Sequence, residues 1–190
     1  MTTPINRKRR LIIFIGILIA IGTGIGVYAH KKSKIFKAYS VGVTTNGQEV
    51  SIAAIYLDNK WAIPGGVSIS GTWRETKRGA SLFNKPLPKE IYINWKDLRS
   101  KRHYDATIDL SPTITRQAQK LPPIHLDVAN NNLHDIELII GLKQSGKVVV
   151  WLSNAPHQHN LTGRVMYVVG RAQGHITQSS APYYPSASNH

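Results

Sequence analysis

The densest cluster of potential metal ligands in this chain is the pair His157 and His159, separated by one residue. On a strand, residues two apart point to the same face, so the two imidazoles could share a metal ion. A metal site needs a third protein ligand, and His175, His134 and Asp135 could provide one only through the fold. The residues around the pair are rich in Asn and Pro, which is typical of a polar loop. We therefore predict a loop here, with no metal site and no cofactor.

Hydrolytic chemistry has no sequence motif to support it. Ser68 and Ser70 lie near glycines, but no Gly-x-Ser-x-Gly elbow presents either serine as a nucleophile. Gly65-Gly66 lacks the helix and the Lys-Ser/Thr pair of a phosphate loop. Carboxylates that could act as an acid–base pair carry no motif and are expected at strand ends or on outward faces; they are Glu90, Asp97, Asp105 and Asp109. We predict a protein that is not an enzyme.

Aromatic and basic residues provide the first candidate for a binding surface. Trp61 and Trp73 flank a Pro-Gly-Gly segment, and the basic residues that follow them are Arg74, Lys77 and Arg78. Tryptophan and arginine concentrate at binding hot spots, so this region could contact a partner. The alternative is that both indoles only cap the hydrophobic core.

A second candidate is the basic segment that contains Lys96, Arg99, Lys101, Arg102 and His103. It lies between two expected strands, where exposed cations can simply discourage edge pairing. Such a patch also suits an acidic protein surface or anionic lipid headgroups. We take this loop as the preferred partner-binding candidate.

These candidates must be positioned by short strands, because the residues after 38 alternate in polarity or are β-branched. Asn46-Gly47 between 39–44 and 49–57 predicts a hairpin. Further strands are expected at 67–72, 90–95, 104–110, 135–143, 147–152 and 164–169. A polar loop is expected at 74–89, and a short helix at 113–120 after Pro112. The expected fold is mainly β: one antiparallel β-sandwich-like or half-barrel domain over residues 39–172, with at most one short helix and a mobile tail at 173–190.

The amino-terminal segment predicts a membrane anchor. An uncharged run of nineteen residues, Leu11–Ala29, follows the basic residues Arg7–Arg10. As a helix it would be about 28 Å long, close to the hydrocarbon thickness of a bilayer. A signal peptide cleaved after Ala29 is the alternative. Gly22 and Gly26 form a small-xxx-small pair through which two such helices could associate weakly.

The charges around this segment predict its orientation. Basic residues before a membrane helix favour the cytoplasmic side, so residues 1–10 are expected inside and the domain outside. The stalk at 30–38 also carries lysines, which weakens the asymmetry and leaves the inverted topology as the alternative.

The composition narrows the partners further. The chain has a net charge of +14, but eight cations flank the apolar segment and leave +6 for residues 38–190. Because no nucleic-acid-binding motif accompanies this excess, we do not expect nucleic acid as a partner. The chain has no cysteine, which excludes disulfides, thiol catalysis and a lipidated cysteine.

Two blocks of the chain resemble a bacterial envelope family known as domain of unknown function 2931. The first block joins Leu87–Trp95, in which Leu-Pro leads into a strand ending in Trp, to the aromatic strand Arg102–Leu110. The second joins Ile139–Leu142 to the Val-Val-Trp-Leu strand within Gly146–Ser153. The matched blocks lie within residues 56–170. Unlike many members, the chain lacks a lipidated cysteine, and 98–102 is basic where an acidic residue is expected.

The resemblance implies a β domain that faces the periplasm and is tethered to the membrane. Similar small envelope proteins are often immunity partners of type VI secretion effectors, lipases included. We therefore expect a single-pass protein of the bacterial inner membrane that neutralises a secreted toxin or effector, such as a phospholipase, by direct binding. The alternative is an envelope structural or assembly protein that binds a membrane complex or anionic lipid.

Overall fold

The computed structural model describes residues 35–71, 78–125, 132–133, 136–154 and 163–178. The chain divides into two compact units, Met1–Lys34 and Ile35–His190, and all described residues belong to the second. No helix within the described residues is long and apolar enough to cross a bilayer, and the predicted anchor Leu11–Ala29 lies outside them.

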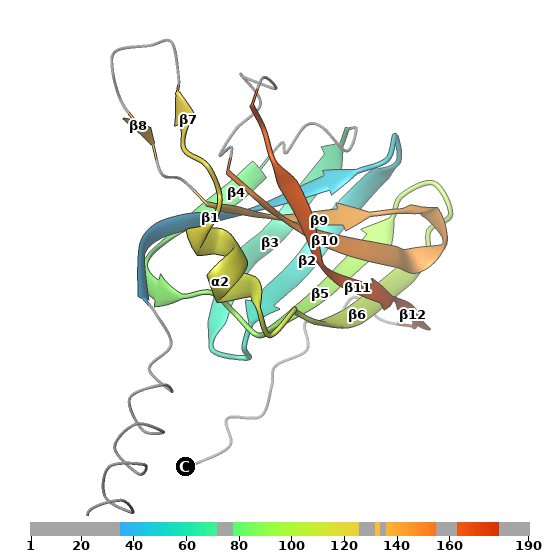
Figure 1. Cartoon of the computed structure of the whole chain (residues 1–190). Helices are drawn as coiled ribbons and strands as arrows, with labels where there is room; N and C mark the ends of the chain where they lie inside the picture. Colours follow the sequence, from blue (N-terminus) through green and yellow to red (C-terminus); the bar gives the residue numbers. More distant parts are fainter. Residues whose placement is uncertain (1–34, 72–77, 126–131, 134–135, 155–162, 179–190) are drawn as a thin grey trace, which may run out of the picture. The chain divides into compact units, whose positions relative to one another are not determined.

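The second unit is built from two five-stranded sheets that pack face to face (Figure 1). The elements in chain order are β1 (Ile35–Thr45), β2 (Glu49–Leu57), β3 (Trp61–Ser70), β4 (Arg78–Pro86), β5 (Glu90–Asp97), β6 (His103–Asp109), α2 (Ile114–Gln119), β7 (Ile124–His125), β8 (Asn132–Leu133), β9 (Glu137–Leu142), the 3-10 turn η1 (Gln144–Gly146), β10 (Lys147–Ser153), β11 (Met166–Gln173) and β12 (His175–Thr177). One sheet has the order β11-β10-β9-β1-β4 and the other β12-β6-β5-β2-β3, while β7 and β8 form a separate pair. All pairings are antiparallel except that of β1 with β9. The predicted mainly β fold with one short helix is confirmed.

The core lies between the two sheets and follows the alternation of the strands. Every second residue of β5 and of β9 is buried in it, namely Ile91, Ile93, Trp95, Leu138, Ile140 and Leu142. Burying one such side chain contributes about 1.5–3 kcal/mol. The helix α2 adds Ile114 and Ala118, one turn apart, to the same core. Because the whole described core belongs to Ile35–His190, this unit can fold as a domain of its own.

The predicted hairpin through Asn46-Gly47 is wrong, because the two flanking strands belong to different sheets. β1 pairs with β4 and β9, whereas β2 pairs with β3 and β5. Gly47 takes the expected positive φ of 75°, but it turns the chain from one sheet to the other. The Thr45 hydroxyl donates to the Gln48 carbonyl at 2.7 Å and fixes this corner. β1 is flanked on both sides within its own sheet, so it has no free edge for β2.

The predicted loop at 74–89 is wrong over Arg78–Pro86, which forms β4 antiparallel to β1. β4 is an outer strand, and none of its described side chains is fully buried, so its sequence shows no strongly apolar face. β3 is also an outer strand; it begins at Trp61, six residues before the predicted start at 67, and includes Pro64-Gly65-Gly66. Proline is tolerated there because an outer strand leaves backbone N–H positions unpaired.

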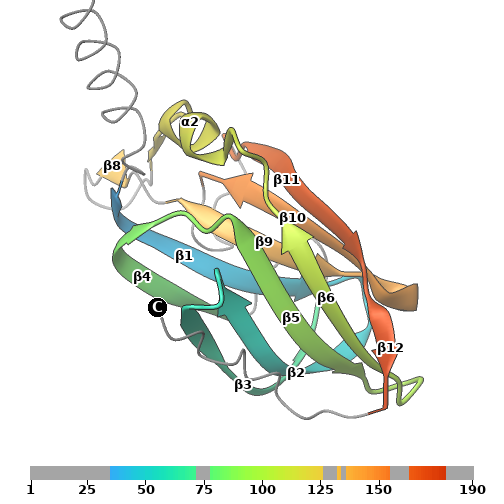
Figure 2. The ribbon, with the colours of Figure 1, turned by 90° about the horizontal axis from the view of Figure 1, so that it is seen from below.

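The seam between the two sheets is bridged on one side by β11 and β12. β11 and β12 follow one another and carry the chain from the edge beside β10 to the edge beside β6 (Figure 2). The Gly174 N–H donates to the Gly146 carbonyl at 2.8 Å, and the Ser111 N–H to the Val169 carbonyl at 2.7 Å. Within the predicted tail at 173–190, Gln173 belongs to β11 and residues 175–177 form β12, while residues 179–190 lie outside the described residues. On the opposite side, no described strand joins β3 to β4.

Candidate binding site

The turn between β5 and β6 is organised by a buried carboxylate. Asp97 is 7% exposed, and its Oδ1 accepts hydrogen bonds from the backbone N–H groups of Arg99 at 3.0 Å and Ser100 at 2.8 Å. The Asp97 N–H donates to the Arg102 carbonyl at 2.9 Å, which closes the turn. Lys101 takes the left-handed conformation with φ 58°. This Asp-anchored turn holds the backbone of the predicted basic loop in place.

The cations on this turn point to solvent. Arg99, Lys101 and Arg102 are exposed, and Lys96 is half-buried. None of the three exposed cations forms an ion pair with a described acidic residue. The acid nearest to them in sequence, Asp97, is engaged with the backbone instead. These charges are therefore available to a partner.

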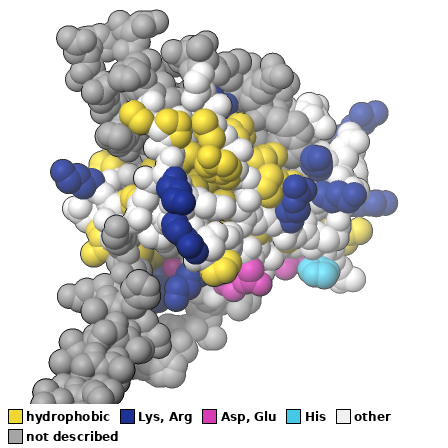
Figure 3. All heavy atoms as spheres, viewed as in Figure 1, with side chains coloured by type: hydrophobic (Ala, Val, Ile, Leu, Met, Phe, Trp, Pro, Cys, Tyr) yellow, Lys and Arg dark blue, Asp and Glu magenta, His cyan; other side chains and the backbone are white. Residues whose placement is uncertain are grey.

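The other sheet adds two lysines at the same end of the domain. The η1 turn lies beside the base of the β5–β6 turn, since a Cβ on Gly146 would meet the Tyr104 ring at 2.9 Å. Lys143 and Lys147, both exposed, flank η1. Figure 3 shows Lys and Arg side chains gathered at the end where these turns lie in Figure 1. We define the basic end as Lys96, Arg99, Lys101, Arg102, Lys143 and Lys147. Sequence reasoning missed the last two, because no spacing links positions this far apart in the chain.

Glu49 and His103 lie near the basic end without joining it. Glu49 is exposed at the start of β2, and its backbone carbonyl accepts from the Leu98 N–H at 3.0 Å. His103 is half-buried opposite Lys96 in the β5–β6 register. Its Nδ1 is buried and has no hydrogen-bond partner among the described residues. His103 therefore belongs to the base of the turn rather than to its exposed surface.

The first predicted binding surface does not assemble from the residues that the structure describes. Trp61 begins β3 and lies near the end of β4, where the Lys85 Nζ sits 5.3 Å from the centroid of its ring. Arg78 begins β4, seven residues before Lys85, or about 23 Å away along a strand. Trp61 and Arg78 thus occupy different ends of the domain. Trp73, Arg74 and Lys77 lie outside the described residues.

The candidate residues for catalysis and metal binding do not form a site among the residues that the structure describes. Within the described ranges, no three His, Cys, Asp or Glu side chains lie close enough to hold a metal ion. The pair His157 and His159 lies outside these ranges. Ser68 and Ser70 are exposed on β3, and Glu90 accepts from the Asn59 side chain at 3.3 Å.

A buried polar cluster joins Arg164 to Glu137 at the start of β9 and Ser153 at the end of β10, and no motif in the sequence predicts it. Arg164 Nη2 lies 3.9 Å from Glu137 Oε2, and its Nε donates to the Ser153 hydroxyl at 3.2 Å. Burial lowers the pKa of the Arg164 guanidinium, and the Glu137 carboxylate opposes this shift. Asn154, which is 2% exposed, accepts from the Val165 N–H at 2.8 Å. The cluster fixes the start of β11 and so supports the fold.

Comparisons with known proteins place the chain in a family. No curated protein and no solved structure matches it. One family model, described as a protein of unknown function, matches residues 28–182, which include both sheets. The chain therefore belongs to the DUF2931 family of proteins of unknown function.

Proposed function

We propose that this protein is a periplasmic binding protein, anchored in the bacterial inner membrane through Leu11–Ala29, that neutralises a secreted effector by direct contact. A phospholipase delivered by a type VI secretion system is the effector class that we favour. The observation that carries the binding role is the set of cations on the Asp97-anchored turn, which have no ion-pair partner among the described residues.

The geometry of this turn suits recognition of an acidic protein surface. Association loses less conformational entropy when the contact loop is already ordered, and here Asp97 orders it. Arg99 and Arg102 offer planar guanidinium groups that can bind carboxylates through two hydrogen bonds. Complementary charge also speeds the encounter between the two proteins. A secreted toxin that must be captured before it acts is a partner for which such speed matters.

The position of Ile35, at the start of β1, also supports the proposed binding role. β1 is eleven residues long, or about 33 Å, and the chain enters the domain at its first residue, Ile35. At its other end, the Gln48 side chain donates to the Leu142 carbonyl at 3.2 Å, next to the η1 turn of the basic end. Ile35, the first residue of β1, therefore lies at the end of the domain opposite the basic end.

The same cations also suit anionic lipid headgroups or an acidic component of an envelope complex. An envelope structural or assembly protein is therefore the second candidate. Its partner would be recovered from membranes rather than from a secreted toxin, which the experiment below distinguishes.

The test deletes the gene together with its immediate genomic neighbours and competes the mutant against its parent. We expect the parent to kill the mutant, and the wild-type gene alone to rescue it. The double variant Arg99→Glu/Arg102→Glu should fail to rescue. The matched control Lys60→Glu/Lys89→Glu places the same charge change on exposed residues at the other end of the domain and should rescue fully.

Immunoblots must show equal amounts of both variants in the membrane fraction. Survival of the deletion mutant would argue against the immunity role, and equal rescue by both variants would argue against the basic end as its contact surface. Co-purification of envelope proteins or anionic lipid, with no secreted protein, would favour the second candidate.

A further inference from the structure

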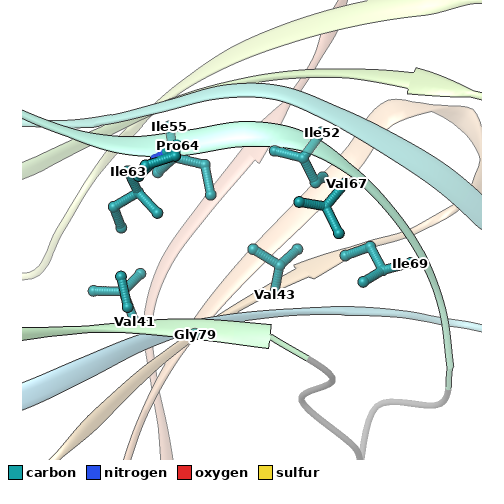
Figure 4. Close-up of a pocket in the computed structure, with 10 residues that line it drawn as sticks. Val41, Val43, Ile52, Ile55, Ile63, Pro64, Val67, Ile69 and Gly79 are labelled. Carbon is teal, nitrogen blue, oxygen red and sulfur yellow. The ribbon is translucent and has the colours of Figure 1, made fainter.

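An apolar cavity of about 170 Å³ lies between the two sheets, next to the seam between β3 and β4 that no described strand closes. Its walls come from β1 and β4 in one sheet and from β2 and β3 in the other. The side chains that line it are aliphatic, and Figure 4 shows those of the two layers facing one another across it. Voids of this size are few in a folded domain, because protein interiors are close-packed.

A β-bulge shapes the wall of the cavity. The register of β2 with β3 shifts between Ile52 and Ala54, so Ala53 has no direct partner on β3. Gly65 lies so close to this bulge that a Cβ there would overlap the Ala53 carbonyl oxygen. Bulges re-aim the neighbouring side chains and are enriched beside binding sites. Here Ile52 and Pro64, which flank the irregularity, both line the cavity.

The outer strands at this seam are poorly suited to pairing with a strand from another protein. β3 carries Pro64, which has no N–H to donate, beside the bulge. β4 carries Asn84 in the left-handed conformation with φ 52°, followed by Lys85. Such features protect a sheet edge from further strand pairing. The seam therefore resists an added strand but leaves side-chain space behind it.

The shape and chemistry of this space select a class of ligand. The lining residues on β3 run from Ile63 to Ile69, a distance of about 20 Å along a strand, so the cavity follows this strand over most of its length. An apolar protein cavity of about 150 Å³ stays dry and takes up a molecule as small as benzene. The side chains of these walls offer no hydrogen-bond partner to a polar group of a ligand, so they favour an apolar one.

We propose that this cavity binds the hydrocarbon end of an acyl chain, with the polar headgroup outside the seam between β3 and β4. The chain can come from a free fatty acid or from a lipid, since both present the same alkyl group. This site is separate from the basic end, and its test needs no effector.

The test uses the domain 35–190, which holds both sheets and the described core, in buffer without detergent. Decanoate is the fatty-acid probe, and dihexanoyl phosphatidylcholine below its micellar concentration is the lipid probe. We expect at least one of them to bind by isothermal titration calorimetry and to raise the Tm. The probe that binds more tightly identifies the source of the chain. Absence of binding by both probes would overturn the proposal.

Two matched variants locate the binding. Ala80 lines the cavity, so Ala80→Leu should fill it and weaken binding at least tenfold. Ala62 is exposed on β3, and the same substitution there, Ala62→Leu, should leave binding within twofold of wild type. If Ala80→Leu does not fold, as circular dichroism would reveal, Val67→Met makes a smaller change in the same wall and should weaken binding at least threefold. Equal binding by a folded cavity variant and by Ala62→Leu would overturn the proposal, as would binding of benzene without either acyl probe.

Discussion

Replacing Asp97 by alanine should destabilise the domain and disorder the basic turn. The substitution removes one carboxylate oxygen that accepts two backbone N–H groups, at 3.0 and 2.8 Å. A hydrogen bond to a charged group contributes about 1.5–3 kcal/mol, and the lower value applies because these bonds are only partly buried. The loss in the free energy of unfolding is therefore about 3 kcal/mol for the two bonds. For a domain of this size, that lowers the Tm by roughly 6–12 °C.

Asp97→Asn separates the effect of the hydrogen-bond acceptor from that of the charge, because the asparagine side chain keeps an acceptor oxygen but is neutral. This variant should lower the free energy of unfolding by only about 1 kcal/mol. The control is Asp105→Ala, since Asp105 is half-buried on β6 and should change stability by less than about 0.5 kcal/mol. Urea denaturation measures all three variants, and hydrogen exchange of the Arg99 and Ser100 amides reports the turn itself. We would abandon this reasoning if Asp97→Ala lost less than Asp97→Asn, or if the two amides stayed protected in Asp97→Ala.

Three further substitutions test the parts of the fold that support the site. Burial raises the pKa of Tyr39, and the nearby Asp58 adds to this shift. The contribution of the protonated phenol to the free energy of unfolding is therefore fully present below about pH 10 and declines as the pH rises further. Tyr39→Phe should cost about 1 kcal/mol at neutral pH, through the lost hydrogen bond to a backbone carbonyl, and should flatten the alkaline decline between urea titrations at pH 8 and pH 11. Glu137→Ala leaves the Arg164 charge buried without its carboxylate and should cost about 3 kcal/mol in thermal unfolding; a change below 1 kcal/mol would contradict this role. Gly65→Ala must displace the bulge at Ala53, and a Tm equal to that of wild type would show that the close approach is not required.

The strands that could be predicted from the sequence are those with a clear alternation over a short stretch. β5, β6 and β10 were found within a few residues of their ends, and so was the helix after Pro112. In each case the buried face repeats with the period of the element, and this pattern is local. A reader of the sequence needs no knowledge of the partner strand to see it.

The errors fall where the structure depends on a partner strand. Asn46-Gly47 has the residues of a hairpin turn, yet β1 and β2 pair with other strands, and no local pattern encodes that choice. β4 was missed because it is an outer strand in which none of the described side chains is fully buried, so it has no strongly apolar face. β12 was missed because three residues carry too short a pattern, although pairing with β6 orders them.

The sequence alone determined the residue types of this protein's binding candidates: a basic segment between two strands, no cysteine, and an uncharged run near the start. Only the tertiary structure decided which candidates meet. It buried Asp97 under the basic turn, brought Lys143 and Lys147 to the same end, and separated Trp61 from Arg78. The physical reason is that sheet order follows from contacts between distant strands, whose free energy no short stretch of sequence contains.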